Sequence, residues 1–280
     1  MARTVEEVGF DSVWLGDHLL YDLPGGLTRG PWEAWTGLAA LAAVTTRVEL
    51  GPLVASTSFH APAMLAKQAA TVDAISGGRL ILGLGAGWNE REYRAFGFPY
   101  DHRVSRFEEA FTIIRRLLHD GRADFAGSYY RVDDCVLDPG PTRPGGPPLM
   151  LGSTSPRMMS IGLPHVDAWN VWWSEYGNTP EGFATVRARV EEAAARAGRR
   201  PGEVAATAAV LVGMPTGTGR LMGDKYRRGV APVQGSAADV SGHLEAMARA
   251  GATHLQLVVD PITVESIETL GDALRLLDRD

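Results

Sequence analysis

The sequence lacks several features, and each absence argues against a class of protein. It has a single cysteine, Cys135, so no intramolecular disulfide can form, which is typical of a reducing compartment. No apolar run approaches the roughly 18 residues that a membrane-spanning helix needs. The N-terminal residues also lack the apolar core of a signal peptide. We therefore expect a cytoplasmic protein without a membrane partner.

The charge balance and the missing motifs narrow the function further. There are 27 Lys and Arg residues against 33 Asp and Glu residues, a net charge of -6, and no basic tract stands out. No nucleic-acid partner is expected from such a chain. His-x-His, His-Glu-x-x-His and paired cysteines are absent, which argues against a metal site. The absence of Gly-x-Ser-x-Gly disfavours a hydrolase nucleophile.

Short apolar runs alternate with segments of helical period along the whole chain. The residues are 45% hydrophobic and 21% charged, as in globular proteins. This alternation predicts βα units around a parallel sheet. Strands are expected at residues 12–15, 48–54, 79–83, 149–151, 166–171, 204–212 and 254–259. Helices are expected at residues 2–8, 32–44, 61–75, 89–96, 104–119, 237–250 and 264–277, and two more begin after Ser155 and Thr179, where a hydroxyl residue precedes proline.

From this order we predict a (β/α)8 TIM barrel that forms one domain over residues 1–280. Residues 121–148, with a strand-like piece at 129–132, are expected to be an irregular insertion, and residues 215–235 an irregular loop. Seven strands are found where a closed barrel needs eight, and the helical segment 2–8 precedes the first of them. We therefore expect the barrel to lack its first strand, because the start is truncated or because something else fills the gap. The two exposed sheet edges predict a homodimer.

Unusual residues follow four of the predicted strands, at the end where βα barrels carry their active-site loops. Asp17 and His18 come first. An imidazole there can act as a general acid or base near pH 7, and an ordinary surface histidine is the alternative. The loop at residues 51–62 can hold a strained peptide beside a cofactor, and an ordinary βα connection is the alternative.

Glycines and hydroxyl residues mark the other two strand ends. Gly83, Gly85 and Gly87 would let a flat or anionic ligand approach the backbone, but they do not match the Gly-x-Gly-x-x-Gly dinucleotide pattern, and a tight turn is the alternative. Residues 152–157 place small polar side chains and Arg157 at a helix start, where free N–H groups can bind a phosphate. A well-capped helix is the alternative there.

Several segments, in one order, resemble the bacterial-luciferase-like oxidoreductase family. They are residues 9–19, 67–73, 76–88, 92–97, 167–170 and 255–261, and together they extend over almost the whole chain. Asp17–His18 after one strand and Gly-x-Gly-x-Gly-Trp at residues 83–88 are most similar to the branch of the family that uses the deazaflavin coenzyme F420.

The resemblance implies a barrel that binds a flavin or deazaflavin at the carboxyl ends of its strands. His18 would exchange a proton beside the reactive ring carbon, and Asp17 would help to hold the strand end and the cofactor. A cis peptide between Leu53 and Val54 is implied against the ring face. The ring edge would be lined by Ala86, Gly87 and Trp88, and the phosphate bound by Gly152, Ser153, Thr154, Ser155 and Arg157.

Three functions are compatible with these residues. The leading hypothesis is F420-dependent hydride transfer to or from a small organic substrate. The alternative is a monooxygenase in which reduced flavin mononucleotide (FMN), supplied by a separate reductase, activates oxygen. A non-catalytic flavin-binding or degenerate barrel is the third. Trp88 stands where sugar-phosphate dehydrogenases of the family carry an acidic residue, so that substrate class is not expected, and residues 153–155 replace the glycine-rich phosphate loop of relatives.

Overall fold

The computed structural model describes residues 1–22, 27–214 and 229–278, and the chain forms two compact units. The first unit comprises Trp14–Asp22 and Thr28–Gly152. The second unit comprises Met1–Val13 and the chain from Ser153 onward. Of the loop predicted at 215–235, residues 215–228 lie outside the described residues.

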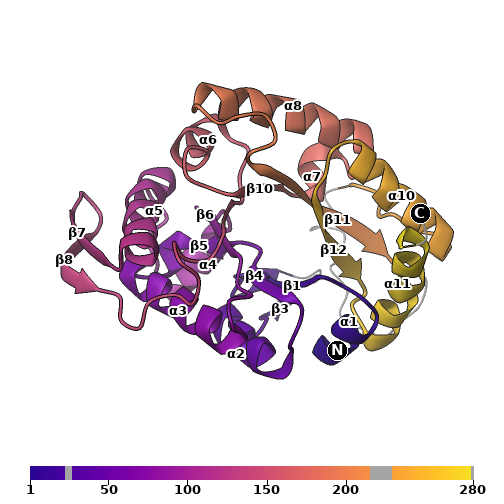
Figure 1. Ribbon diagram of the computed structural model, residues 1–280, viewed down its shortest axis with the longest axis horizontal. Coiled ribbons are helices and arrows are strands. Elements are labelled where there is room, and N and C mark those ends of the chain that lie inside the picture. Colours follow the sequence, from indigo (N-terminus) through magenta and orange to yellow (C-terminus); the bar gives the residue numbers. More distant parts are fainter. Residues whose placement is uncertain (23–26, 215–228, 279–280) are drawn as a thin grey trace. The chain divides into compact units, whose positions relative to one another are not determined.

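Parallel strands form the centre of the first unit (Figure 1). Strand β5 (Ala55–Ser56) pairs with β6 (Leu82–Gly85), and β6 pairs in turn with β9 (Leu149–Leu151). Strand β4 (Glu49–Pro52) is joined to the residues before β6 by a parallel bridge between Leu50 and Leu80. The carbonyl of Leu15, which ends β1 (Ser12–Leu15), accepts a hydrogen bond of 2.8 Å from the N–H of Leu53. All residues of β6 and β9 are buried, so these strands form part of the core.

Three helices cover these strands, with α2 (Ala34–Val44) packed against α3 (Pro62–Ser76) and α3 packed against α5 (Arg103–Asp120). Helix α2 begins where the Glu33 carboxylate accepts hydrogen bonds from the first free N–H groups of the helix. Helix α3 begins with proline and ends at Gly77, whose φ of 70° favours glycine. The predicted apolar stripe of α5 is buried, which confirms its role in packing; it consists of Phe107, Phe111, Ile114 and Leu118. The short elements of this unit are β2 (Tyr21–Asp22), β3 (Thr28–Arg29), η2 (Thr57–Phe59) and α4 (Glu90–Phe96).

The insertion between α5 and β9 contains an antiparallel hairpin of β7 (Arg122–Ala126) and β8 (Arg131–Val136), which lies beside α5 (Figure 1). Its turn is fixed by the carboxylate of Glu109 on α5. That group accepts hydrogen bonds from the N–H groups of Ser128, Tyr129 and Tyr130 at 2.7, 2.9 and 3.0 Å. The strand-like piece predicted at 129–132 overlaps β8 only at Arg131 and Val132, because Tyr129 and Tyr130 lie in the turn held by Glu109.

A buried carboxylate anchors the chain where it returns from this hairpin. Asp73 of α3 is fully buried, and it accepts hydrogen bonds from the N–H of Thr142 at 3.0 Å and from the guanidinium of Arg143 at 2.9 Å. Residues 137–148 are therefore tied to the helical layer, although they form no regular element.

Parallel strands also form the centre of the second unit. Strand β11 (Ala205–Gly213) pairs with β10 (Ala168–Val171) on one side and with β12 (His254–Asp260) on the other. The helices of this unit are α1 (Ala2–Glu7), α6 (Pro156–Gly162), α7 (Trp173–Tyr176), α8 (Pro180–Arg196), α10 (Ala237–Arg249) and α11 (Val264–Leu277). Helix α10 packs against α11 and α8, and α1 packs against α11.

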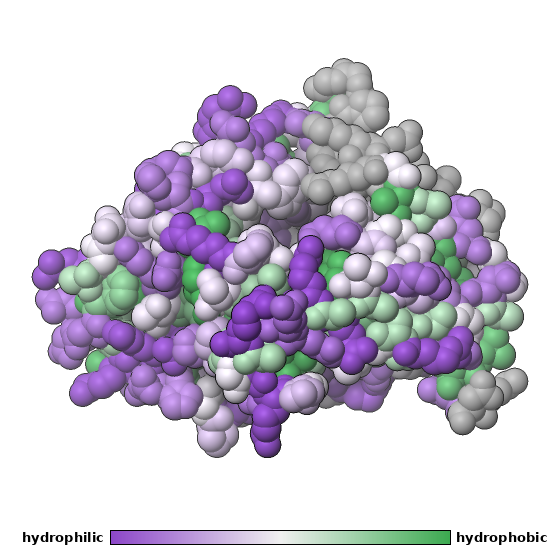
Figure 2. Space-filling model, turned by 90° about the horizontal axis from the view of Figure 1, so that it is seen from above, coloured by the Kyte–Doolittle hydropathy of each residue, from purple (hydrophilic) through white to green (hydrophobic). Residues whose placement is uncertain are grey.

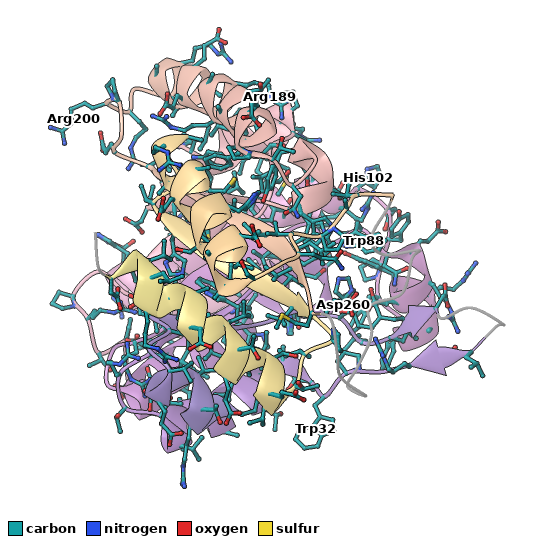
Figure 3. All side chains as sticks on the ribbon, turned by 90° about the vertical axis from the view of Figure 1, so that its right-hand side faces the viewer. Trp32, Trp88, His102, Arg189, Arg200 and Asp260 are labelled. Atoms are coloured by element: carbon teal, nitrogen blue, oxygen red, sulfur yellow. The ribbon has the colours of Figure 1, made fainter. Side chains whose placement is uncertain are left out.

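These elements confirm an α/β fold built on parallel strands, and the bounds of several elements differ from expectation. The strand predicted at 48–54 is β4 at Glu49–Pro52. The strand predicted at 79–83 is β6 at Leu82–Gly85, because Leu82–Leu84 pair with β9 and Leu84–Gly85 pair with β5. The helix predicted from Trp32 begins at Ala34, and Trp32 itself is 92% exposed and points away from the ribbon (Figure 3). A closed barrel, a missing first strand, a single domain and a homodimer stay predictions.

On the face shown in Figure 2, hydrophilic residues surround small, separate hydrophobic patches. Within the described ranges, no helix combines the length and the apolar character needed to cross a membrane.

Candidate active site

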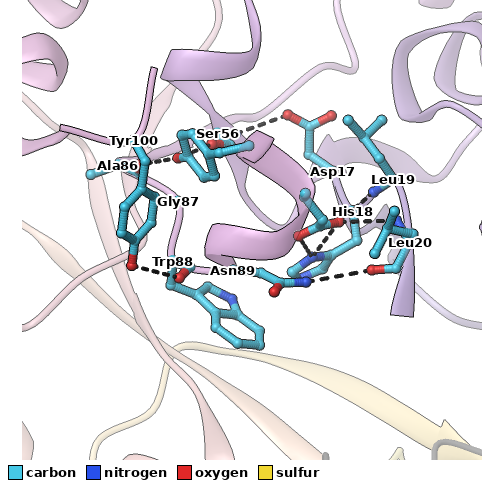
Figure 4. A network of polar contacts seen from close by, with 12 residues as sticks. Asp17, His18, Leu19, Leu20, Ser56, Ala86, Gly87, Trp88, Asn89 and Tyr100 are labelled. Carbon is cyan, nitrogen blue, oxygen red and sulfur yellow. Dashed lines mark hydrogen bonds and ion pairs between the residues drawn. The ribbon is translucent and has the colours of Figure 1, made fainter. Parts of the chain in front are cut away.

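An imidazole and a buried carboxylate meet just beyond the end of β1 in the first unit (Figure 4). His18 Nδ1 lies 2.9 Å from Oε2 and 3.2 Å from Oε1 of Glu92 on α4. Glu92 is 0% exposed, whereas 25% of the His18 side chain is exposed. Because a carboxylate can only accept, its position assigns the proton of the neutral imidazole to Nδ1. The other ring nitrogen, Nε2, is then a proton acceptor.

The same carboxylate holds the backbone beside the imidazole. Glu92 Oε1 accepts hydrogen bonds from the N–H groups of Leu19 at 2.6 Å and Leu20 at 3.1 Å. Burial by itself raises the pKa of the Glu92 carboxyl, but hydrogen bonding and attraction from His18, with the two amides, outweigh burial. The pKa of Glu92 therefore lies below its ordinary value. Glu92 is thus an ionised acceptor that fixes both the ring and the chain of the loop.

Asp17 connects the end of β1 to the end of β5. Its Oδ2 accepts hydrogen bonds of 2.9 Å from the N–H of Ser56 and from Nε2 of His60. Asp17 is 6% exposed. The part of its predicted role that concerns the strand end agrees with these contacts, and its contact with a cofactor stays a prediction.

The peptide between Leu53 and Val54 is cis, as the family resemblance implied. The Val54 side chain lies against three glycines from two strand ends. A Cβ added at Gly83 or Gly85 would come within 2.8 Å of a Val54 methyl carbon, and one added at Gly152 would come within 2.7 Å of Val54 Cγ1. At Gly83 and Gly85, then, the absence of a Cβ makes room for a protein side chain. The sequence pattern predicts room for a ligand or a tight turn at these glycines, and at both positions the Val54 side chain lies in that space.

Gly87 lies in a loop whose carbonyl groups are held by side chains. Tyr93 Oη donates to the carbonyl of Ala86 at 2.7 Å, Arg103 Nη1 donates to the carbonyl of Gly87 at 2.7 Å, and Tyr100 Oη donates to the carbonyl of Trp88 at 3.3 Å. A Cβ at Gly87, whose φ is 72°, would overlap Tyr93 Oη and Ser56 Oγ.

The buried phenol of Tyr93 is central to this arrangement. Tyr93 is 0% exposed, and its Oη lies 3.0 Å from Ser56 Oγ. Burial raises the pKa of this phenol in spite of the Ser56 hydroxyl and the nearby Arg103 guanidinium, so Tyr93 stays protonated and can donate.

Aromatic rings flank the imidazole. The ring centre of His18 lies 5.0 Å from that of Tyr21 and 5.5 Å from that of Trp88, which meets it edge-on and is 48% exposed. The cation of Arg91 is engaged in an ion pair with Asp22. The exposed face of His18 is therefore bordered by rings, which suits a flat or apolar ligand.

Gly152 is the last residue of the first unit, and the other predicted phosphate residues lie in the second unit, at the start of α6. Ser155 occupies the N-cap position without making a side-chain capping bond, and Ser153 Oγ lies 3.4 Å from Ser155 Oγ. Thr154 is buried and donates to the Glu175 carboxylate at 3.0 Å. Ser153, Ser155 and the exposed Arg157 thus have the chemistry that the prediction requires, while the carboxylate beside Thr154 disfavours an anion at that residue.

Sequence reasoning missed Glu92, Tyr93 and Arg103 as site residues. Glu92 and Tyr93 lay in a segment that carried the family resemblance, but no role was assigned to either. No local pattern in the sequence marks Glu92 as a partner of His18, since 74 residues separate the two.

Comparison with known proteins identifies the family of the chain. The profile of the family described as luciferase-like monooxygenase matches residues 1–216. The pyrimidine monooxygenase RutA of Cronobacter sakazakii is 36% identical over 175 residues, which are 61% of this chain and 50% of that protein. RutA of Escherichia coli is 35% identical over the same length, 47% of that protein. The chain thus spans about half the length of the curated relatives it matches.

Solved structures show the same fold at low sequence identity. An F420-dependent secondary alcohol dehydrogenase, in complex with an F420-acetone adduct, aligns with a TM-score of 0.82 at 20% identity, over 99% of this chain and 93% of that one. The monooxygenase RslO1 from Streptomyces bottropensis aligns with a TM-score of 0.79 at 22% identity, over 99% and 92%. From the family match over residues 1–216, the chain belongs to the luciferase-like monooxygenase family.

Proposed function

We propose that this chain is an oxidoreductase that uses reduced FMN to oxygenate a small organic substrate, with His18 as its proton-transferring residue. The observation that carries the proposal is the pairing of His18 with the buried, ionised Glu92. The identity of 36% to pyrimidine monooxygenases favours FMN over F420, which the sequence analysis had placed first. When bound, reduced flavin would supply the electrons that activate oxygen, and a separate reductase would supply the reduced flavin.

The residues of the first unit fit the ring of such a cofactor. The candidate ring contacts are Leu53, Val54, Ala86, Gly87 and Trp88, which offer apolar surface and backbone amides. A flavin ring requires the same combination, a flat apolar face with a polar edge. The hydroxyls of Ser153 and Ser155 and the cation of Arg157 fit a phosphate, and this second assignment, together with Gly152, is a proposal with its own test below.

His18 has a defined task in this proposal. With Nδ1 held by Glu92, Nε2 can take a proton from the substrate and return it, and the imidazole needs no reorientation between the two steps. Tyr21 and Trp88 would limit the approach of water to that nitrogen and favour a flat, uncharged substrate.

F420-dependent hydride transfer is the second candidate, and it is favoured by Asp17–His18 and the Gly-x-Gly-x-Gly-Trp pattern at residues 83–88. Titration of the purified protein with FMN and with F420, each followed by cofactor fluorescence, separates the two candidates. Saturable binding of FMN with oxygen-dependent turnover is expected. Binding of F420 but not of FMN, with turnover under anaerobic conditions, would favour F420-dependent hydride transfer instead. Binding of neither cofactor would contradict both.

A further inference from the structure

Three consecutive carbonyl groups, those of Ala86, Gly87 and Trp88, all accept hydrogen bonds from side chains of the first unit. Loop carbonyls are usually bound by water or backbone, and side chains supply the donors here. Two of the donors, Tyr93 and Arg103, make bonds of 2.7 Å from helices α4 and α5. The conformation of this loop is therefore imposed by the helices behind it.

Fixing a carbonyl also fixes an amide. In a trans peptide the C=O of one residue and the N–H of the next point in opposite directions. The carbonyl of Ala86 points at Tyr93, so the N–H of Gly87 points away from Tyr93. Arg103 holds the same residue through the carbonyl of Gly87. No acceptor for the N–H of Gly87 occurs among the residues that the structure describes. An oriented donor without a protein acceptor, beside the candidate ring contacts, has the properties of a ligand-binding group.

The hydrogen bonds that hold this loop continue to the end of β1. The single proton of the Tyr93 phenol is used on the carbonyl of Ala86, so Ser56 must donate its own proton to Tyr93 Oη. The N–H of Ser56 is in turn bound by Asp17. One line of hydrogen bonds thus connects the residue beside His18 to the Gly87 amide.

We infer that Tyr93 and Arg103 are positioning residues, which hold Gly87 from both sides and aim its amide at the electron-rich edge of the reduced cofactor. This inference rests on the proposed function. Reduction adds negative charge to the pyrimidine-like edge of a flavin or deazaflavin, and N–H groups directed at that edge stabilise the reduced form more than the oxidised form. The two side chains would therefore tune the reduction potential of the cofactor without contacting it.

The test compares Tyr93→Phe with Tyr176→Phe as a matched control. Both phenols are buried donors to a backbone carbonyl, since Tyr176 donates to Ala209 at 2.9 Å, but Tyr176 lies in the second unit. The measurements are the Kd of oxidised and of reduced FMN and the midpoint potential. We expect Tyr93→Phe to weaken the binding of reduced FMN about tenfold more than the binding of oxidised FMN. This difference lowers the midpoint potential of a two-electron couple by about 30 mV. Tyr176→Phe should leave the potential unchanged.

Equal weakening of both cofactor forms by Tyr93→Phe, or none, would overturn the inference. If the Tyr93 variant does not fold, Arg103→Lys replaces it, because lysine keeps the charge and loses the guanidinium geometry. An unchanged potential in that variant would also overturn the inference. Failure of the unmodified protein to bind either cofactor is a separate result, which contradicts the proposed function itself.

Discussion

Replacing Glu92 with glutamine tests the centre of the candidate site with the smallest change of shape. The glutamine oxygen can still accept from the N–H groups of Leu19 and Leu20, as Oε1 does now. The atom that faces His18 becomes an NH2 group, however, which donates. Nδ1 must then accept, so the proton of the neutral imidazole moves to Nε2, and His18 loses its acceptor on the exposed side.

The cost in stability follows from the three hydrogen bonds that Glu92 accepts. A hydrogen bond to a charged group contributes about 1.5–3 kcal/mol and one to a neutral group about 0.5–1.5 kcal/mol, so three bonds lose roughly 3 kcal/mol together. Removing a buried charge offsets part of this loss. We therefore expect the free energy of unfolding to fall by about 1–3 kcal/mol, and turnover to fall on the order of 10²-fold or more.

The difference in free energy of unfolding between the unmodified protein and Glu92→Gln should decrease as the pH is lowered. The pKa of Glu92 is lowered in the folded protein. The ionised carboxylate therefore contributes fully to the free energy of unfolding above the pKa of the unfolded chain, about 4.3, and this contribution is lost as the pH falls through the lower pKa of the folded protein. The gap between the two proteins in urea denaturation should thus be widest near neutral pH and shrink in acid.

The control is Glu90→Gln, an exposed carboxylate on the same helical turn. Nitrogen-15 chemical shifts of the His18 ring report the tautomer directly. If Glu92→Gln keeps the ring shifts of the unmodified protein and its rate, the proton is not directed by Glu92, and the reasoning about Nε2 fails.

Three further predictions concern neighbouring features. Substituting His18 by alanine should lower turnover on the order of 10²-fold or more while the Kd for FMN changes little; an unchanged rate removes His18 from the mechanism. Arg157→Ala should weaken the binding of FMN about tenfold, because a guanidinium–phosphate hydrogen bond is lost, and should hardly change the binding of riboflavin, which has no phosphate. Equal weakening of the binding of both ligands in a fluorescence titration would show that Arg157 has a structural role. Gly85→Ala should lower the free energy of unfolding by about 1–3 kcal/mol through overlap with Val54. Adding Val54→Ala should recover part of that loss, and strictly additive losses in urea denaturation would contradict the packing argument.

The order of strands and helices could be predicted because it depends on local patterns. Apolar runs and proline or glycine at helix ends report the βα rhythm without knowledge of distant contacts. The end of β6 beyond Gly83 could not be predicted, since Gly85 is a poor strand former by itself. Gly85 belongs to the strand because it pairs with Ser56 of β5, which lies far away in the sequence.

The candidate site was recovered only where its residues follow strands. Asp17 and His18 were identified by that position. Glu92 was not identified, because it stands between Arg91 and Tyr93 in a short charged segment whose pattern is typical of a solvent-exposed helix. Only the folding of α4 against the loop after β1 turns this carboxylate inward, and no local pattern reports that contact.

The turn between β7 and β8 has a consequence for how this part of the chain evolves and can be transplanted. Its three amides bind Glu109, which lies outside the hairpin, so the shape of the turn is specified by a helix and not by the turn's own residues. An isolated two-stranded hairpin is marginally stable at best. Residues 122–136 grafted into another scaffold would therefore lose their turn unless a carboxylate came with them. Within this chain, substitutions at 128–130 that keep the amides should be tolerated as long as Glu109 remains.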